Sequence, residues 1–196
     1  MSAPKILVLP GSYRTGSLNA KLAALAAKEL TLLDADVTRI SLVDYPLPLY
    51  DPDLDARSGT PLHALKLKQM IMAHHGVFIA SPDYSASVTP VLKNAIDWVS
   101  RVRERGDPLF AAFRGRVFAI ASASSEPTGG LHGLTALRQI LELGCGALVL
   151  PEQVAVANAE HAFDAMDNIA ETRVANLLRA QLSRLADMAR SIQRGG

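Results

Sequence analysis

Short apolar runs alternate with segments of helical periodicity along the chain, and this order constrains the fold more than any other feature. The first run, Ile-Leu-Val-Leu at residues 6–9, is followed by Leu18, Leu22 and Leu25, which are spaced as on one face of a helix. Parallel strands need a crossover connection, usually a helix. The alternation therefore predicts a parallel sheet covered by helices on both faces.

The same pattern predicts the remaining elements. Strands are expected at residues 6–9, 36–42, 76–80, 115–121 and 147–150, with a possible continuation at 153–156. Helices are expected at 18–33, 62–74, 91–102, 131–143 and 164–192, the last with a buried stripe of leucines. The connection 45–61 holds four prolines and is either an ordered functional loop or a mobile one. Five strands in this order predict a flavodoxin-like, doubly wound α/β fold.

Size, charge and cysteine usage narrow the function classes. The 196 residues, 49% of them hydrophobic, predict a single domain over 1–196. A net charge of +1, from 20 basic and 19 acidic residues, argues against nucleic-acid or membrane partners and favours a small molecule. The single cysteine, Cys145, forbids an internal disulfide. Since Lys5 and Pro10 also interrupt any signal-peptide core, we expect a cytoplasmic protein.

The segment 11–19, Gly-Ser-Tyr-Arg-Thr-Gly-Ser-Leu-Asn, links the first strand to the first helix. Such a loop aims backbone N–H groups and the positive end of the helix at one point, where an anion can bind. Ser12, Ser17 and Asn19 add side-chain donors and Arg14 adds a positive charge. The alternative is an ordinary turn with Ser17 as N-cap. The spacing matches neither the nucleoside triphosphate loop nor the dinucleotide fingerprint, so a mononucleotide or sugar phosphate is favoured.

Two further loops are expected at the same edge of the sheet, where the switch point places ligands. Residues 81–90 follow the third strand, and Pro82 and Pro90 bracket polar residues and Tyr84, which can meet a flat polar ring. Residues 122–130 follow the fourth strand and end in Gly129 and Gly130, which permit close approach of a ligand. Each loop alone could be a surface turn. Three together favour a binding site.

These residues resemble the NADPH-dependent FMN reductase family of flavodoxin-like proteins, which includes quinone and chromate reductases. Segment 11–19 is similar to the family's G-S-x-R-x-x-S-x-N signature. Segments 81–85 and 92–98, Ser-Pro-Asp-Tyr-Ser and Leu-Lys-Asn-Ala-Ile-Asp-Trp, are similar to its S-P-E-Y-N and L-K-N-A-I-D-W motifs. Gly129-Gly130 with Leu137-Arg138 is similar to a third motif. The resemblance spans residues 5–146.

The resemblance implies FMN as cofactor. The phosphate ligands would be Ser12, Arg14, Ser17, Asn19 and the backbone of Leu18, and the ring contacts Pro82, Asp83, Tyr84, Ser85 and Ser124, with Ser122 a weaker candidate. The chain departs from the family pattern at three positions. Asp83 and Ser85 replace a longer Glu and Asn, which weakens flavin binding or alters flavin preference if ring contacts run through these side chains. His132 replaces an arginine found in several relatives, and this bears on substrate access or subunit contacts.

The implied activity is that of an NAD(P)H-dependent oxidoreductase. NADPH or NADH would reduce FMN in a ping-pong cycle, and a quinone, azo compound, metal oxyanion or free flavin would then be reduced. We expect no catalytic side chain and no metal, and the family implies a homodimer or homotetramer, with the 45–61 connection as contact surface. Two alternatives stay open: a flavodoxin-type electron carrier, and a non-flavin module on the same fold.

Other residue clusters have simpler interpretations. The run Arg101, Arg103 and Arg105 is most simply a solvated helix end, with a lesser chance of binding the 2′-phosphate of NADPH or a second subunit. The five histidines lack zinc-ligand spacing. Cys145 is expected to be a buried structural thiol.

Overall fold

Five parallel strands form the sheet in the order β2-β1-β3-β4-β5. The computed structural model describes residues 2–14 and 16–195. Its strands are β1 (Lys5–Pro10), β2 (Asp36–Arg39), β3 (Gly76–Ala80), β4 (Val117–Ala123) and β5 (Leu148–Val156). This strand order is that of flavodoxin-like folds, with a switch point between β1 and β3. The predicted fold class is confirmed.

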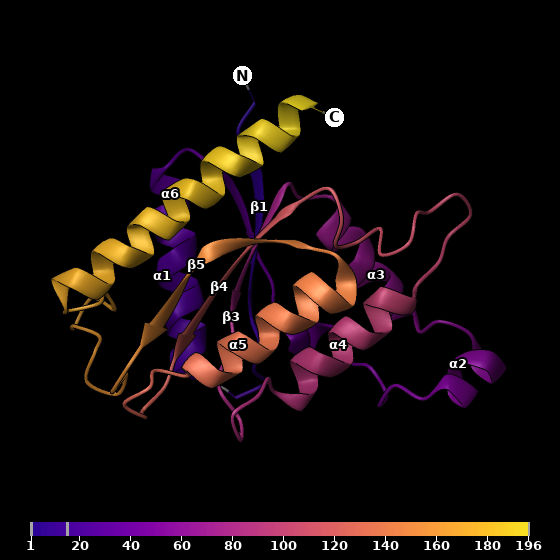
Figure 1. Cartoon of the computed structure of the whole chain (residues 1–196), viewed down its shortest axis with the longest axis horizontal. Coiled ribbons are helices and arrows are strands. Elements are labelled where there is room, and N and C mark those ends of the chain that lie inside the picture. Colours follow the sequence, from indigo (N-terminus) through magenta and orange to yellow (C-terminus); the bar gives the residue numbers. More distant parts are fainter. Residues whose placement is uncertain (1, 15, 196) are drawn as a thin grey trace.

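Helices cover both faces of the sheet (Figure 1). They are α1 (Leu18–Leu32), α2 (Pro52–Ser58), α3 (Leu62–Met72), α4 (Pro90–Arg101), α5 (Leu131–Gln139) and α6 (Thr172–Gly195). Side chains alternate along β1: Ile6 and Val8 pack on the α1 and α6 side, and Leu7 and Leu9 on the side of α3, α4 and α5. Both layers of the core are thus built on a strand that is almost entirely buried, as in a doubly wound sheet.

Two early segments differ from prediction. The second strand ends at Arg39 instead of residue 42, because Ser41 caps a 3-10 turn over Leu42–Asp44 by accepting the Val43 N–H at 3.3 Å. The 45–61 connection contains α2, which Asp51 caps by accepting the Asp53 N–H at 2.8 Å. This connection is therefore an ordered segment with a short helix of its own.

The last helix begins eight residues later than predicted, at Thr172 instead of residue 164. The Asp164 carboxylate accepts the Met166 and Asn168 N–H groups at 2.8 and 2.9 Å and closes a turn that Phe163 and Ile169 extend as a β-bridge. An acidic side chain that binds its own backbone competes with helix formation. The predicted stripe of the helix is correct, because Leu178, Leu182 and Leu185 are fully or nearly fully buried.

The possible continuation at 153–156 is part of one strand, β5. Its pairing with β4 shifts register between Phe118 and Ile120. The buried Gln181 of α6 fills this irregularity, since its Nε2 donates to the carbonyl oxygens of Ile120 and Glu152 at 3.0 and 2.8 Å. A polar side chain on the apolar face of α6 thus satisfies the backbone at the bulge.

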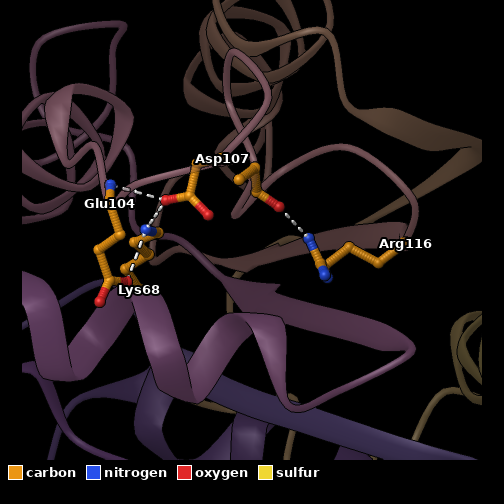
Figure 2. Close-up of polar contacts among 5 residues, drawn as sticks. Lys68, Glu104, Asp107 and Arg116 are labelled. Atoms are coloured by element: carbon orange, nitrogen blue, oxygen red, sulfur yellow. Dashed lines mark hydrogen bonds and ion pairs between the residues drawn. The ribbon is translucent and has the colours of Figure 1, made fainter.

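The connection between α4 and β4 is anchored by charges at the edge of the sheet where the strands begin (Figure 2). The fully buried Lys68 of α3 pairs with Glu104 at 2.8 Å and with Asp107. Arg116 donates to the carbonyl oxygens of Ala111 and Arg114 at 2.7 and 2.8 Å. Burial alone would lower the pKa of the Lys68 ammonium, but its two carboxylate partners raise it above the ordinary value.

Two absences hold for residues 2–14 and 16–195. None of the helices there is long and apolar enough to cross a membrane. Within the same residues, no group of three or more His, Cys, Asp or Glu side chains is placed to hold a metal ion.

Candidate active site

The three predicted loops lie together at the edge of the sheet where the strands end. Pro10, the last residue of β1, pairs with Ala80 at the end of β3, which pairs with Ala121 of β4. The ladder continues into the loops, because the Gly11 N–H donates to the Ala80 carbonyl at 2.8 Å and the Ser81 N–H to that of Ala121 at 2.8 Å. The loops therefore begin side by side.

The first loop leaves hydrogen-bond donors available for an anion. Ser12 Oγ accepts the Arg14 N–H at 3.1 Å, and Ser17 Oγ accepts the Ala20 N–H at 3.0 Å as the N-cap of α1. Each hydroxyl that accepts in this way keeps its own hydrogen to donate. The Arg14 side chain is exposed, and in the part of the chain that the structure describes no carboxylate pairs with it. Thr15 lies outside the described residues.

The first turn of α1 adds a fixed positive potential. It holds no acidic residue, so nothing there offsets the positive end of the helix dipole. Leu18 is the first residue of this helix and is half-buried. Hydroxyl donors, a guanidinium without an acidic partner and a helix N-terminus suit a phosphate dianion.

Asn19 has a second role that the sequence did not suggest. Its Nδ2 donates to the Ala123 carbonyl at 2.8 Å, and its Oδ1 accepts the Ala123 N–H at 3.0 Å. The side chain is buried, so this pair of bonds ties the start of α1 to the end of β4. We interpret Asn19 first as a residue that positions the first loop, with one remaining Nδ2 hydrogen for a ligand.

The second loop is a tight hairpin turn. Tyr84 and Ser87 exchange N–H to carbonyl bonds at 2.9 and 3.0 Å, and the two residues between them, Ser85 and Ala86, have φ of 52° and 59°. Turns with two positive φ values favour Asn and Gly, so Ser-Ala here stores backbone strain. Pro82 is buried beneath the loop, while Tyr84 and Ser85 are exposed at its tip.

Asp83 connects the second loop to α5. Its Oδ2 accepts the Gly133 N–H at 2.9 Å, and His132 Nδ1 lies 4.0 Å from the same oxygen. The N-cap residue of α5 is Gly130, which offers no capping side chain. Asp83 therefore caps the helix from another loop, with its negative charge at the positive helix end. This capping role is compatible with the shorter side chain of Asp83, at the position where the family pattern has Glu.

The third loop carries the two predicted serines at different depths. Ser124 is half-buried and its Oγ accepts the Glu126 N–H at 3.2 Å. Ser122 is fully buried, and a Cβ added at Gly130 would lie 2.1 Å from its Oγ. Gly130 has φ of 85° and no room for a side chain, so it is required for this close approach. Ser122 supports the loop from beneath, whereas Ser124 lies nearer its surface.

Three residues that position the site were not among the predicted site residues, although two of them, Asn94 and Trp98, lie in the 92–98 motif. Thr89 caps α4 by accepting the Leu92 N–H at 3.2 Å and donates to the Gly11 carbonyl at 2.5 Å, which joins the first and second loops. Asn94 and Trp98 of the same helix donate to the Pro48 carbonyl at 2.9 and 2.7 Å, which docks the 45–51 segment on α4. A Thr-Pro pair at a helix start was the available signal for Thr89.

Other candidate residues lie away from the loops. Arg101 is at the far end of α4, about 18 Å from Thr89 by helix rise, and stacks on the Tyr50 ring at 5.5 Å. Arg103 and Arg105 follow it. Burial raises the pKa of the Cys145 thiol to about 11, so it is protonated and inert at neutral pH, as predicted for a structural thiol. These residues are not brought together with the three loops.

Comparison with known proteins identifies relatives over most of the chain. Residues 4–161 match the family model described as NADPH-dependent FMN reductase. An NAD(P)H-dependent FMN reductase of Pseudomonas aeruginosa is 34% identical over 183 residues, 92% of each chain. A quinone reductase of Escherichia coli is 36% identical over 138 residues, 70% of this chain and 69% of the relative. Among solved structures, the NAD(P)H:(acceptor) oxidoreductase FerB of Paracoccus denitrificans superposes with a TM-score of 0.75 at 27% identity, covering 96% of this chain and 98% of FerB.

Proposed function

The chain belongs to the NADPH-dependent FMN reductase family, and from this premise we propose that it binds FMN across the three loops and transfers electrons from NAD(P)H to a small acceptor. It is an NAD(P)H-dependent oxidoreductase with FMN as its expected cofactor. The observation that carries the proposal is the convergence of three loops at the switch point, with an anion site in the first loop. Its relatives are reductases, which supports an enzyme over an electron carrier.

The residues present fit the phosphate end of FMN. Ser12 and Ser17 keep hydroxyl hydrogens, Arg14 has no acidic partner among the described residues, and α1 points its N-terminus at the loop. We therefore assign Ser12, Arg14, Ser17 and the backbone of Leu18 to the phosphate, with Asn19 positioning the loop. This donor set neutralises a dianion without a metal ion.

The flat ring would lie on the second and third loops. We assign Pro82, Asp83, Tyr84, Ser85 and Ser124 to this surface and Ser122 to its support. Large apolar side chains are exposed in the first and second loops and directly after the third: Tyr13 is 48%, Tyr84 49% and Leu131, the first residue of α5, 44% exposed. Aromatic and aliphatic side chains around a polar site are suited to stacking against flat rings, and ring stacking is how a nicotinamide and an aromatic acceptor would meet the flavin.

Bound FMN supplies the hydride chemistry, and the chain contributes binding, orientation and electrostatics. The bonds from Thr89 to Gly11, from Asn19 to Ala123 and from Gly133 to Asp83 hold the three loops in one arrangement before any ligand arrives. The exposed apolar rim admits donor and acceptor in turn. We propose a ping-pong cycle with a quinone, azo compound, metal oxyanion or free flavin as acceptor; initial-rate lines that intersect instead of running parallel would contradict it.

Anaerobic absorbance spectroscopy tests the proposal. Protein incubated with FMN and desalted should keep a flavin band that bleaches on addition of NADPH or NADH; a colourless protein would overturn it, and a band that stays would indicate a carrier. Arg14→Ala should weaken FMN binding by about 1.5 kcal/mol, the lower end for a charged hydrogen bond, because Arg14 is exposed. Arg57→Ala, an exposed arginine of α2, is the matched control and should leave FMN binding unchanged.

We further propose a single domain over 1–196, a cytoplasmic location and a homodimer or homotetramer, without nucleic-acid or membrane partners. Support for self-association comes from apolar side chains exposed within the 45–61 connection and beside it: Leu49 is 80%, Leu62 60% and Val43 55% exposed. Light scattering on a size-exclusion column measures the mass directly. A monomer would refute the assembly and leave the flavin chemistry intact.

A further inference from the structure

An open hollow lies beside the first loop, on the side of β2. It has a volume of about 370 Å³, within the range of small-molecule pockets. We call it the β2 hollow, and its polar lining consists of Ser12, Arg14, Arg39, Ser41 and Asp44, with Tyr13 among the remaining residues. Arg39, the last residue of β2, and Ser41 have no part in the flavin site as described above.

The charges in the β2 hollow favour an anion. Arg39 contributes a guanidinium that the flavin site does not use, Arg14 is shared with the site that we assign to the FMN phosphate, and Asp44 is the one acidic residue among the lining residues that the structure describes. In the same described part of the chain, no carboxylate lies within ion-pair distance of either arginine. Guanidinium forks match phosphate oxygens in a bidentate geometry, and the Ser41 hydroxyl adds a donor that the flavin site does not use.

We propose that the β2 hollow binds the 2′-phosphate of NADPH, with Arg39 as the principal ligand, so that this protein prefers NADPH to NADH. The inference rests on the proposed function. The 2′-phosphate is the group that distinguishes the two dinucleotides, and an arginine near the end of a second strand is a known device for binding it in dinucleotide sites.

The place of the hollow suits a dinucleotide whose nicotinamide lies on the flavin ring. β2 and β1 are neighbours, as are β1 and β3, and neighbouring strands are about 4.8 Å apart. The end of β2 is therefore about 10 Å from that of β3, a distance that an NADPH molecule can span. Arg101 is the last residue of α4, at the end away from the three loops, and Arg103 and Arg105 follow it.

Isothermal titration of the FMN-loaded protein with 2′,5′-ADP tests the site without turnover. The 2′-phosphate should make 2′,5′-ADP bind about tenfold or more tightly than 5′-ADP, and added salt should reduce the difference. Arg39→Ala should weaken 2′,5′-ADP about tenfold and leave 5′-ADP little changed. Asp44→Asn, which removes the acidic side chain of the described lining, should strengthen 2′,5′-ADP severalfold. Arg105→Ala is the charge-matched control on the distant edge and should change neither.

Each contrary result has a definite meaning. Equal affinity for 2′,5′-ADP and 5′-ADP overturns the inference, while a flavin band that NADH bleaches leaves the proposed function standing. If 2′,5′-ADP binds the FMN-free protein but not the FMN-loaded one, the β2 hollow is the binding site of the FMN phosphate and the inference is wrong. Loss of binding in Arg105→Ala but not in Arg39→Ala overturns it as well. A retained flavin band in Arg39→Ala verifies that the variant is folded.

Discussion

Asp83 shows how one side chain can serve both the fold and the site. Its carboxylate accepts the Gly133 N–H at 2.9 Å from a loop fifty residues earlier in the chain. A Cβ added at Gly133 would lie 3.0 Å from Asp83 Cα, so the two backbones are in close contact. The second loop and the start of α5 are therefore joined by a hydrogen bond and by backbone contact, and the carboxylate that joins them belongs to a residue that we assign to the flavin surface.

Replacing Asp83 by Ala removes the cap of α5. We expect about 1 kcal/mol lower stability, as for other lost N-caps, together with weaker FMN binding because the second loop is released. Asp83→Asn keeps an acceptor oxygen and should retain most of both. Urea unfolding of the FMN-free protein and FMN titration measure the two effects. If Asp83→Ala bound FMN as tightly as the parent with its stability reduced, the side chain would act on the fold alone.

The sequence motif indicated that Asn19 belongs to the site, but it did not indicate that the hydrogen-bond partner of Asn19 is the backbone of Ala123. The motif predicted an amide near a phosphate, and the structure instead places both ends of that amide on Ala123. No local pattern predicts a contact between residues 104 positions apart in the sequence. The residue types of the first loop were therefore predictable, whereas the division between ligand and support required the fold.

Asn19→Ala should destabilise the protein even without flavin. Two backbone groups of Ala123 would lose their buried partner, and we expect a cost of about 2 kcal/mol. Urea unfolding of the FMN-free variant measures it. Ser12→Ala, in the same loop but with no bond to β4, is the matched control and should cost little in the absence of FMN. An Asn19→Ala variant that was fully stable when FMN-free but bound FMN poorly would mean that Asn19 is a phosphate ligand only.

At the scale of elements, the apolar pattern of the sequence predicted the buried strands of the sheet. It did not predict helix boundaries that are set by hydrogen bonds from polar side chains to the backbone. The strands of the switch point are almost entirely buried, and a continuous apolar run is the signal that such strands leave. The start of α6 was wrong because Asp164 closes a turn, and α2 was missed because a helix of seven exposed or half-buried residues leaves no apolar stripe. Capping chemistry decides such boundaries.

The Lys68 cluster joins α3 to the connection between α4 and β4 (Figure 2). Lys68→Met removes the cation and leaves two carboxylates behind. Breaking a buried pair typically costs about 3–5 kcal/mol, but Glu104 is 46% exposed and can be solvated, so we expect about 2 kcal/mol from urea unfolding at pH 7. Lys21→Met, which breaks an exposed pair with Asp167, is the control and should cost about 0.5 kcal/mol or less.

The same cluster predicts a pH dependence of stability. The bond from Lys68 lowers the pKa of the Asp107 carboxyl below its ordinary value of 3.8. Stability from this group is therefore present above about pH 4 and is lost as the pH falls through the lower, folded-state pKa. The raised pKa of Lys68 adds stability that is present below about pH 10 and is lost at higher pH. Unfolding midpoints of the parent should fall at both extremes, and Lys68→Met should remove the part that this cluster contributes.

At the scale of the molecule, a small number of bonds turns separate loops into one site. Thr89, Asn19 and Asp83 each join a different pair of the structures that surround the switch point. Loops that are fixed in advance lose little conformational entropy when a ligand binds, which favours affinity. The Lys68 cluster lies at the opposite edge of the sheet and contributes to stability alone, whereas Asn19 and Asp83 serve both stability and the binding site.

Comparison of FMN with riboflavin, which lacks the phosphate, tests how binding is divided between the first loop and the loops assigned to the flavin ring. A ligand at 100 times its Kd stabilises a protein by about 2.7 kcal/mol, which for a domain of this size raises Tm by roughly 5–11 °C. Riboflavin at the same concentration keeps the contacts of the flavin ring but lacks those of the phosphate with the first loop. The increase in Tm that it causes should therefore be less than half as large as that with FMN. Arg14→Ala should narrow the difference between the two ligands by lowering the FMN shift alone. Equal shifts for FMN and riboflavin in the parent would mean that the ring surface carries the binding and that the first loop is only a strand-to-helix turn.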